Sequence, residues 1–80
     1  MTQEDLLVEL KPIFTEIMEE DGDKITLATS MNDLENWDSL NHLQFVVAVE
    51  KKYSIRFKSN EIESFRTVGQ ICEAILAKLN

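Results

Sequence analysis

The 80-residue chain is poor in the residues that cross-link or break a fold: it has one cysteine, one proline and two glycines. The single thiol, Cys72, cannot form an internal disulfide and suits a reducing compartment. Because tight turns usually need glycine or proline, their scarcity favours helices over strands. The sequence lacks an apolar run of the roughly 20 residues that a membrane span requires, and its first residues lack the basic start of a signal peptide. We therefore expect a soluble cytoplasmic protein.

Basic residues are also few. Eight Lys and Arg stand against fifteen Asp and Glu, which gives a net charge of −7. The only local basic cluster comprises Lys51, Lys52, Arg56 and Lys58. Nucleic-acid binding needs a larger basic surface, so we expect protein partners and no nucleic acid. With 44% hydrophobic residues, the chain can build one domain over residues 1–80 with a modest core, but not a large substrate cavity.

A first helix is predicted after Thr2, which with Asp5 approaches a capping-box pattern. Pro12 removes one backbone hydrogen bond and is expected to bend this helix near residues 8–12 without ending it. Gly22 is expected to end the helix in the left-handed cap conformation. The apolar positions that recur at helical spacing are Leu6, Leu7, Leu10, Ile13, Phe14, Ile17 and Met18.

A long loop is predicted over residues 23–38, with a single helical turn near residues 31–34. Its apolar anchors are Ile25, Leu27, Met31 and Leu34. The second helix is predicted to begin after Asp38, the strongest N-cap signal in the chain, and to end near Lys52. Its apolar positions are Leu40, Leu43, Phe45, Val46, Val47 and Val49.

The last third of the chain is predicted to hold two further helices. Apolar and polar residues alternate over residues 53–57, but no second strand is available, so we expect an extended connection there. Ser59 is expected to cap a short helix over residues 60–65, and Thr67 with Gln70 forms a capping box for a fourth helix. Its inward positions are Val68, Ile71, Cys72, Ile75 and Leu79. The predicted fold class is all-α, a four-helix bundle with three long helices, one short helix and a long loop between the first two.

The sequence Asp38-Ser39-Leu40 places one hydroxyl on the first turn of the second helix, beside a capping carboxylate. His42 follows three residues later, so a nucleophile–base pair is possible. A serine hydrolase also needs an orienting group and oxyanion donors around a pocket, which so small a chain with one histidine does not offer. A calcium loop that starts at Asp21 fails at its glycine and at two ligand positions. We predict no catalytic residue and no metal site.

The sequence resembles the acyl and peptidyl carrier proteins in three stretches. They are the run from Trp37 to Tyr53, Ile-x-Phe at 55–57, and Phe-Arg-Thr-Val-Gly-Gln-Ile at 65–71. The resemblance covers nearly the whole chain. It implies that a phosphopantetheinyl transferase attaches a 4′-phosphopantetheine arm from coenzyme A to Ser39. The thiol of the arm would then carry an acyl or aminoacyl group as a thioester. Asp38 would help to orient the transferase's metal or base. A helix N-terminus suits the phosphodiester anion of such an arm.

The resemblance also implies docking of partner enzymes near Ser39: the transferase, an acyl-loading ligase or transferase, and downstream biosynthetic enzymes. We expect a monomer that presents its cargo and is not itself an enzyme. Trp37 can either anchor the loop in the core or contact partners. The expected docking residues are Trp37, Leu40, Asn41, His42, Gln44, Glu50 and Lys51.

The chain departs from the family members of fatty acid synthesis, whose second helix is usually highly acidic. The acidic face is reduced here to Asp38 and Glu50, Trp37 stands where glycine is common, and residues 57–59 read Phe-Lys-Ser where Ile-Pro-Asp is more usual. We therefore expect a dedicated pathway, such as secondary metabolite, polyketide, lipid or surface polysaccharide synthesis. Its enzymes are expected to present an acidic or apolar surface to the basic cluster.

Two other hypotheses for the function stay open. The leading alternative is a small helical protein-interaction module without a prosthetic group, and a minimal serine hydrolase is the third. Several bulky residues also have two possible roles, either as core or as the lining of an internal cleft that shelters a short acyl chain. They are Leu40, Val46, Val47, Tyr53, Phe57 and Phe65.

Overall fold

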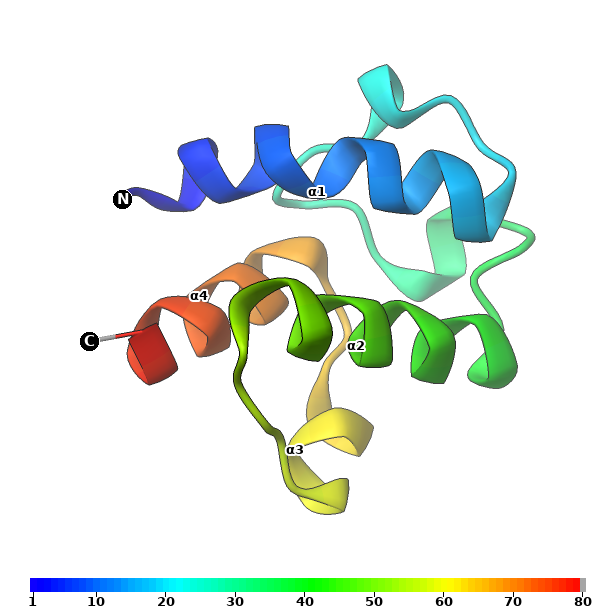
Figure 1. Ribbon diagram of the computed structural model, residues 1–80. Coiled ribbons are helices and arrows are strands. Elements are labelled where there is room, and N and C mark those ends of the chain that lie inside the picture. Colours follow the sequence, from blue (N-terminus) through cyan, green and yellow to red (C-terminus); the bar gives the residue numbers. More distant parts are fainter. Residues whose placement is uncertain (80) are drawn as a thin grey trace.

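The computed structural model describes residues 1–79 and confirms the all-α fold class. Within these residues four α-helices follow one another, three long and one short, and a loop of twenty residues separates the first two (Figure 1). Two single 3₁₀ turns interrupt that loop. The α-helices are α1 (Gln3–Met18), α2 (Ser39–Tyr53), α3 (Ser59–Ser64) and α4 (Val68–Leu79), and the turns are η1 (Gly22–Lys24) and η2 (Met31–Asp33).

Helix α1 packs against both α2 and α4, while the short α3 lies on the side of α2 away from α1 (Figure 1). At the centre of the bundle the ring of Phe14 stacks on Phe45 at 4.3 Å and meets Trp37 edge-on at 5.4 Å. Leu79, predicted to face inward, is 43% exposed because it lies in the last turn of α4, beyond the packed part of the bundle. The fully buried helical residues are Leu6, Leu10, Phe14, Met18, Phe45, Val46, Val49, Val68, Ile71, Cys72 and Ile75.

The start of α1 agrees with the prediction from the sequence, whereas its end does not. The Thr2 hydroxyl accepts the Asp5 backbone N–H at 3.1 Å and the Asp5 carboxylate accepts the Thr2 N–H at 3.0 Å, so the predicted capping box is confirmed. The helix runs through Pro12 but ends at Met18, where Glu19 adopts the left-handed conformation with φ 55°. The prediction that Gly22 is the left-handed cap is therefore wrong.

Gly22 meets a different requirement, which is close approach to α1. Its N–H donates to the Thr15 hydroxyl at 3.0 Å, and a Cβ at this position would lie 2.6 Å from both the Lys11 carbonyl oxygen and the Thr15 hydroxyl. That separation is too short for any side chain. The first turn after α1 is thus held against the helix by the absence of a side chain.

The long loop is tied to the start of α4. The backbone N–H groups of Val68 and Gly69 donate to the carbonyls of Thr29 (2.9 Å) and Leu27 (2.8 Å), and the Met31 N–H donates to Arg66 O at 3.2 Å. The expected helical turn is present as η2. The predicted anchors all contact the core, Ile25 fully buried and Leu27, Met31 and Leu34 partly buried.

The last two helices begin by different means. Thr67 and Gln70 form the predicted capping box, with both bonds at 3.2 Å. Ser59, in contrast, is the first helical residue of α3 and not its cap, so that prediction is wrong. Lys58 occupies the cap position, and its N–H donates to the Glu61 carboxylate at 2.9 Å. Residues 54–57 form the expected connection without a strand, with Phe57 buried.

Substitutions at positions 19 and 22 test why a glycine stands at position 22. We expect Gly22→Ala and Gly22→Asn each to lower the free energy of unfolding by about 1–3 kcal/mol, because either Cβ would collide with α1. Glu19→Gly should raise it by up to about 1 kcal/mol by relieving the left-handed backbone. Urea unfolding followed by circular dichroism measures all three. If Asn at position 22 were tolerated while Ala was not, backbone conformation and not close approach would explain the glycine.

Candidate functional site

Side-chain hydrogen bonds of Asp38 and Asn41 fix the first turn of α2. The Asp38 carboxylate accepts the Asn41 N–H at 2.8 Å, which confirms Asp38 as the N-cap. The Asn41 side-chain amide donates to Asn36 O at 2.7 Å, and the Asn36 amide donates to Met18 O at 2.9 Å. The start of α2 is thereby fixed to the end of α1, although the two are separated by twenty residues of loop.

Ser39 is the first residue of α2, and its side chain is exposed. Within residues 1–79 its hydroxyl forms no hydrogen bond with another protein group. The N–H groups of the first helical turn have no intrahelical acceptors, and the helix dipole is positive at this end. An anionic phosphodiester on Ser39 would therefore meet free donors and a favourable field. The residues present fit a phosphorylated group at this oxygen.

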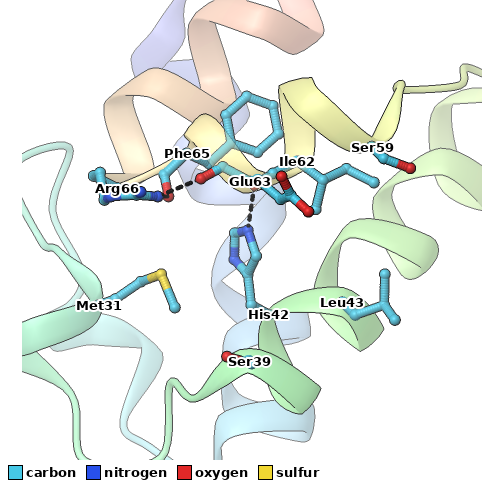
Figure 2. A pocket seen from close by; sticks show the side chains of 9 residues that line it. All are labelled: Met31, Ser39, His42, Leu43, Ser59, Ile62, Glu63, Phe65 and Arg66. Atoms are coloured by element: carbon cyan, nitrogen blue, oxygen red, sulfur yellow. Dashed lines mark hydrogen bonds between the residues drawn. The ribbon is translucent and has the colours of Figure 1, made fainter.

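An open groove with a volume of about 560 Å³ lies beside Ser39, between α2 and α3. Figure 2 shows Ser39 on one wall and α3 on the other, with the His42 ring rising from α2 toward α3. The groove is partly polar: Arg66 and Glu63 lie on its α3 side. Its lining residues are Met31, Ser39, His42, Leu43, Ser59, Ile62, Glu63, Phe65 and Arg66.

His42 links three parts of the fold. Its Nδ1 accepts the indole N–H of Trp37 at 3.0 Å, which leaves the proton on Nε2, and Nε2 donates to the Ile62 carbonyl of α3 at 2.9 Å. Trp37 is 2% exposed and His42 is 6% exposed. The expectation that these two side chains are surface docking contacts is therefore wrong, and Trp37 takes the core role that the sequence left open.

The same bonds bear on the hydrolase hypothesis. Both ring nitrogens of His42 are already occupied, one as acceptor and one as donor. His42 therefore has no free nitrogen with which to take a proton from Ser39, although the two residues line the same groove. A nucleophile without a base is not activated. The geometry gives Ser39 an accessible oxygen but does not offer it His42 as a base.

The other expected docking residues differ in exposure. Leu40, Gln44 and Lys51 are exposed on α2, whereas the Asn41 amide is half-buried in its bond to the loop. Glu50 is half-buried, and its carboxylate accepts the Phe57 N–H at 2.8 Å. The groove residues on α3 and η2 were absent from the predicted site, because no local pattern indicates which distant segment will face Ser39.

The six residues that the sequence left open between core and cleft differ in burial. Val46, Phe57 and Phe65 are buried, whereas Leu40 and Val47 are exposed. Only Phe65 of the six lines the groove beside Ser39. Burial therefore separates these residues into core and surface.

Residues 1–79 hold no cluster of three or more His, Cys, Asp or Glu side chains placed to bind a metal ion. No helix of that part of the chain combines the length and apolar character needed to cross a membrane.

Comparison with known proteins identifies the family. The family model described as "Phosphopantetheine attachment site" matches residues 8–75, which is most of the chain and includes the start of α2. The chain belongs to this family of carrier proteins. It is 32% identical to the acyl carrier protein of an Exiguobacterium species over 99% of this chain and 100% of the relative. It is 29% identical to that of Petrotoga mobilis over 100% of this chain and 94% of the relative.

The fold agrees with a solved structure of the same family. The solution NMR structure of the holo acyl carrier protein from Geobacter metallireducens has a TM-score of 0.81, with 36% identity, over 91% of this chain and 84% of that one. The protein is thus an acyl carrier protein, a carrier and not a catalyst, with covalently attached 4′-phosphopantetheine as its cofactor. Its partners in general are a phosphopantetheinyl transferase and biosynthetic enzymes.

Removing the acceptor of the Trp37 indole tests the link through His42. We expect His42→Phe to lower the free energy of unfolding by about 1–3 kcal/mol, because the buried indole N–H loses its partner. Gln44→Ala, an exposed change on the same helix, should have little effect. Urea unfolding followed by circular dichroism measures both. In the Trp37→Phe background, His42→Phe should lower the free energy of unfolding by a smaller amount. An equal decrease in the two backgrounds would show that the bond contributes nothing to stability.

Proposed function

We propose that Ser39 is the residue that bears the 4′-phosphopantetheine arm, and that the carrier serves a dedicated biosynthetic pathway. The observation that carries the first part is the exposed Ser39 hydroxyl, free of bonds to residues 1–79, at the N-terminus of α2. It lies inside the span matched by the attachment-site family. When bound, the arm supplies a thiol that holds acyl or aminoacyl cargo as a thioester. The protein's own residues hold the attachment point rigid and leave it open to an external catalyst.

The hydrogen bonds around Ser39 support a carrier that positions the hydroxyl and leaves the reaction to an external enzyme. The Asp38 cap, the Asn41–Asn36 bonds and the His42 link fix the backbone around Ser39 without engaging its hydroxyl. The transferase can therefore approach an oxygen that is already positioned. The charge of Asp38 next to Ser39 is available to orient a metal or base of the transferase, the role that the family resemblance implies.

The pathway proposal rests on the surface of α2. After Asp38 the helix carries one acid, Glu50, and two bases, Lys51 and Lys52. Enzymes that recognise a highly acidic helix would find little to bind here. We infer that the carrier works with its own loading enzyme and downstream enzymes in secondary metabolite, polyketide, lipid or surface polysaccharide synthesis, and that it acts as a monomer.

The thiol of the one cysteine, Cys72, is not accessible for thioester chemistry. Cys72 is fully buried, and burial raises the pKa of its thiol to about 11. Near pH 8 its thiolate fraction is on the order of 10⁻³. Cargo transfer and thiol exchange both need an accessible thiolate. The thiol of the arm therefore has no competitor from this side chain in the folded protein.

Attachment is tested by incubating the carrier with coenzyme A and a broad-specificity phosphopantetheinyl transferase. We expect the intact mass to rise by one arm and Ser39→Ala to abolish the increase. Ser59→Ala is the matched control, because Ser59 is also exposed, lines the same groove and begins a helix. Modification of Ser59→Ala should equal wild type. A folded wild-type chain that stays unmodified would favour the interaction module without a prosthetic group.

Thiol titration at pH 8 tests the isolation of Cys72. The folded unmodified carrier should react very slowly with an aromatic disulfide reagent, because the thiol is buried and its pKa is raised to about 11. The chain unfolded in urea should react completely, with one thiol. After modification by the transferase, the folded carrier should show one fast thiol, from the arm. Fast reaction of the folded unmodified protein would show that Cys72 is exposed to cargo chemistry.

A further inference from the structure

Helix α1 presents apolar side chains on its outer side, away from α2 and α4. Val8 is 64% exposed and Pro12 is also exposed, and the spacing of four residues makes them neighbours on the helix surface. They line a shallow groove of about 380 Å³ together with η1, which lies beside α1 on that outer side (Figure 1). We call this the α1–η1 groove, formed by Val8, Lys11, Pro12, Thr15, Asp21 and Asp23.

Pro12 also leaves a hydrogen-bond acceptor on this side of α1. In a regular helix the N–H of residue 12 would donate to the carbonyl of Val8, and proline has no N–H. The helix nevertheless continues through Pro12 to Met18. The Val8 carbonyl therefore lacks its usual helical donor, between two side chains that are exposed. A donor from outside the chain would satisfy it.

Four carboxylates surround the apolar pair. Glu4 and Glu16 continue its row at a spacing of four residues on either side, and both are exposed. Asp21 and Asp23 line the groove from the other side, in and next to η1. Lys11, half-buried, is the one base in the lining. The surface thus combines an apolar centre with an acidic border.

These carboxylates are available to a partner. The ion pair found among residues 1–79 joins Lys78 to Glu61, so none of the four is in an ion pair within that part of the chain. Residues 1–24 hold eight acidic and two basic residues, whereas residues 39–80 hold four acidic and six basic ones. The negative charge of the protein is therefore concentrated around α1 and η1, where a cationic partner is favoured.

We propose that the α1–η1 groove is a docking surface for an arginine-bearing amphipathic segment of a pathway enzyme, which holds the carrier by this side. This inference rests on the proposed function. Charge complementarity fixes the sign of the partner. Arginine fits because its fork of N–H donors can satisfy the Val8 carbonyl and a carboxylate together. An apolar side chain of the same segment would cover Val8 and Pro12.

The position suits retention of the carrier, not reaction at Ser39. The groove that contains Ser39 lies between α2 and α3, and α3 lies on the side of α2 away from α1 (Figure 1). The two grooves share no lining residue. An enzyme bound to α1 would therefore leave Ser39 and its arm accessible. Such a contact raises the effective concentration of the cargo for the enzyme.

The surface is tested with a short synthetic helical peptide that has leucine on one face and arginine on the other. Amide chemical shifts of the isotope-labelled full chain should change around residues 7–16 and 20–24. The Kd should rise with salt, and a peptide with glutamate in place of arginine should not bind. Shift changes centred on α2, or spread evenly over all exposed carboxylates, would overturn the surface.

Variants separate the apolar side chain from the backbone acceptor. Val8→Lys should raise the Kd of the peptide about tenfold or more, because it places a cation in the apolar contact. Leu79→Lys is the matched control: it makes the same charge change at an exposed apolar residue of α4 and should leave the Kd unchanged. Equal Kd values for Val8→Lys and wild type would contradict the groove. Circular dichroism checks that the variants fold.

Pro12→Ala tests the free carbonyl. Alanine supplies the missing N–H to Val8, so the Kd of the peptide should rise about threefold while the thermal midpoint does not fall. A Kd equal to that of wild type would remove the carbonyl from the contact.

Pathway enzymes encoded beside the carrier's gene provide the last test. At least one should bind the unmodified carrier, be displaced by the peptide and bind Val8→Lys about tenfold more weakly. The peptide should not slow attachment of the arm to Ser39. Slowed attachment, or undiminished binding of Val8→Lys by every enzyme, would refute the proposal. Failure of the proposed function would appear separately, as a wild-type chain whose mass does not change with the transferase.

Discussion

The hydrogen bond from the Trp37 indole to His42 Nδ1, continued from His42 Nε2 to the Ile62 carbonyl, is the interaction on which the site depends. It joins the end of the long loop, the first turn of α2 and the short helix α3. A six-residue helix has little stability of its own, so α3 needs such a tether. By holding α3 opposite Ser39, the bond shapes the groove beside that residue.

The link also explains why a polar ring occupies an otherwise apolar interior. A buried imidazole is tolerated only when its nitrogens are satisfied, and here each nitrogen has one partner. Trp37 adds its ring to the Phe14–Phe45 cluster while its N–H meets His42. The core and the site are thus one structure, and loosening either would loosen the other.

Around Ser39, some polar side chains are bonded to the protein's own backbone and other groups are left exposed. Asp38, Glu50 and Asn41 are bound to backbone groups, whereas the Ser39 hydroxyl and the apolar side chains of Leu40, Leu43 and Val47 are left accessible. Rigid backbone with a free oxygen suits a residue that an external enzyme modifies. The same division leaves apolar and cationic side chains of α2 exposed.

Local signals in the sequence determined the four helices, the caps at Thr2, Asp38 and Thr67, and the place of Ser39 at a helix start, because each depends on residues within about four positions. The tertiary structure decided the rest. Burial of His42 needs Ile62 twenty residues away, the bond of the Glu50 carboxylate needs the chain to fold back at Phe57, and Gly22 is needed because α1 passes beside it. Such contacts join segments that only packing brings together, and composition and spacing do not specify which segments meet.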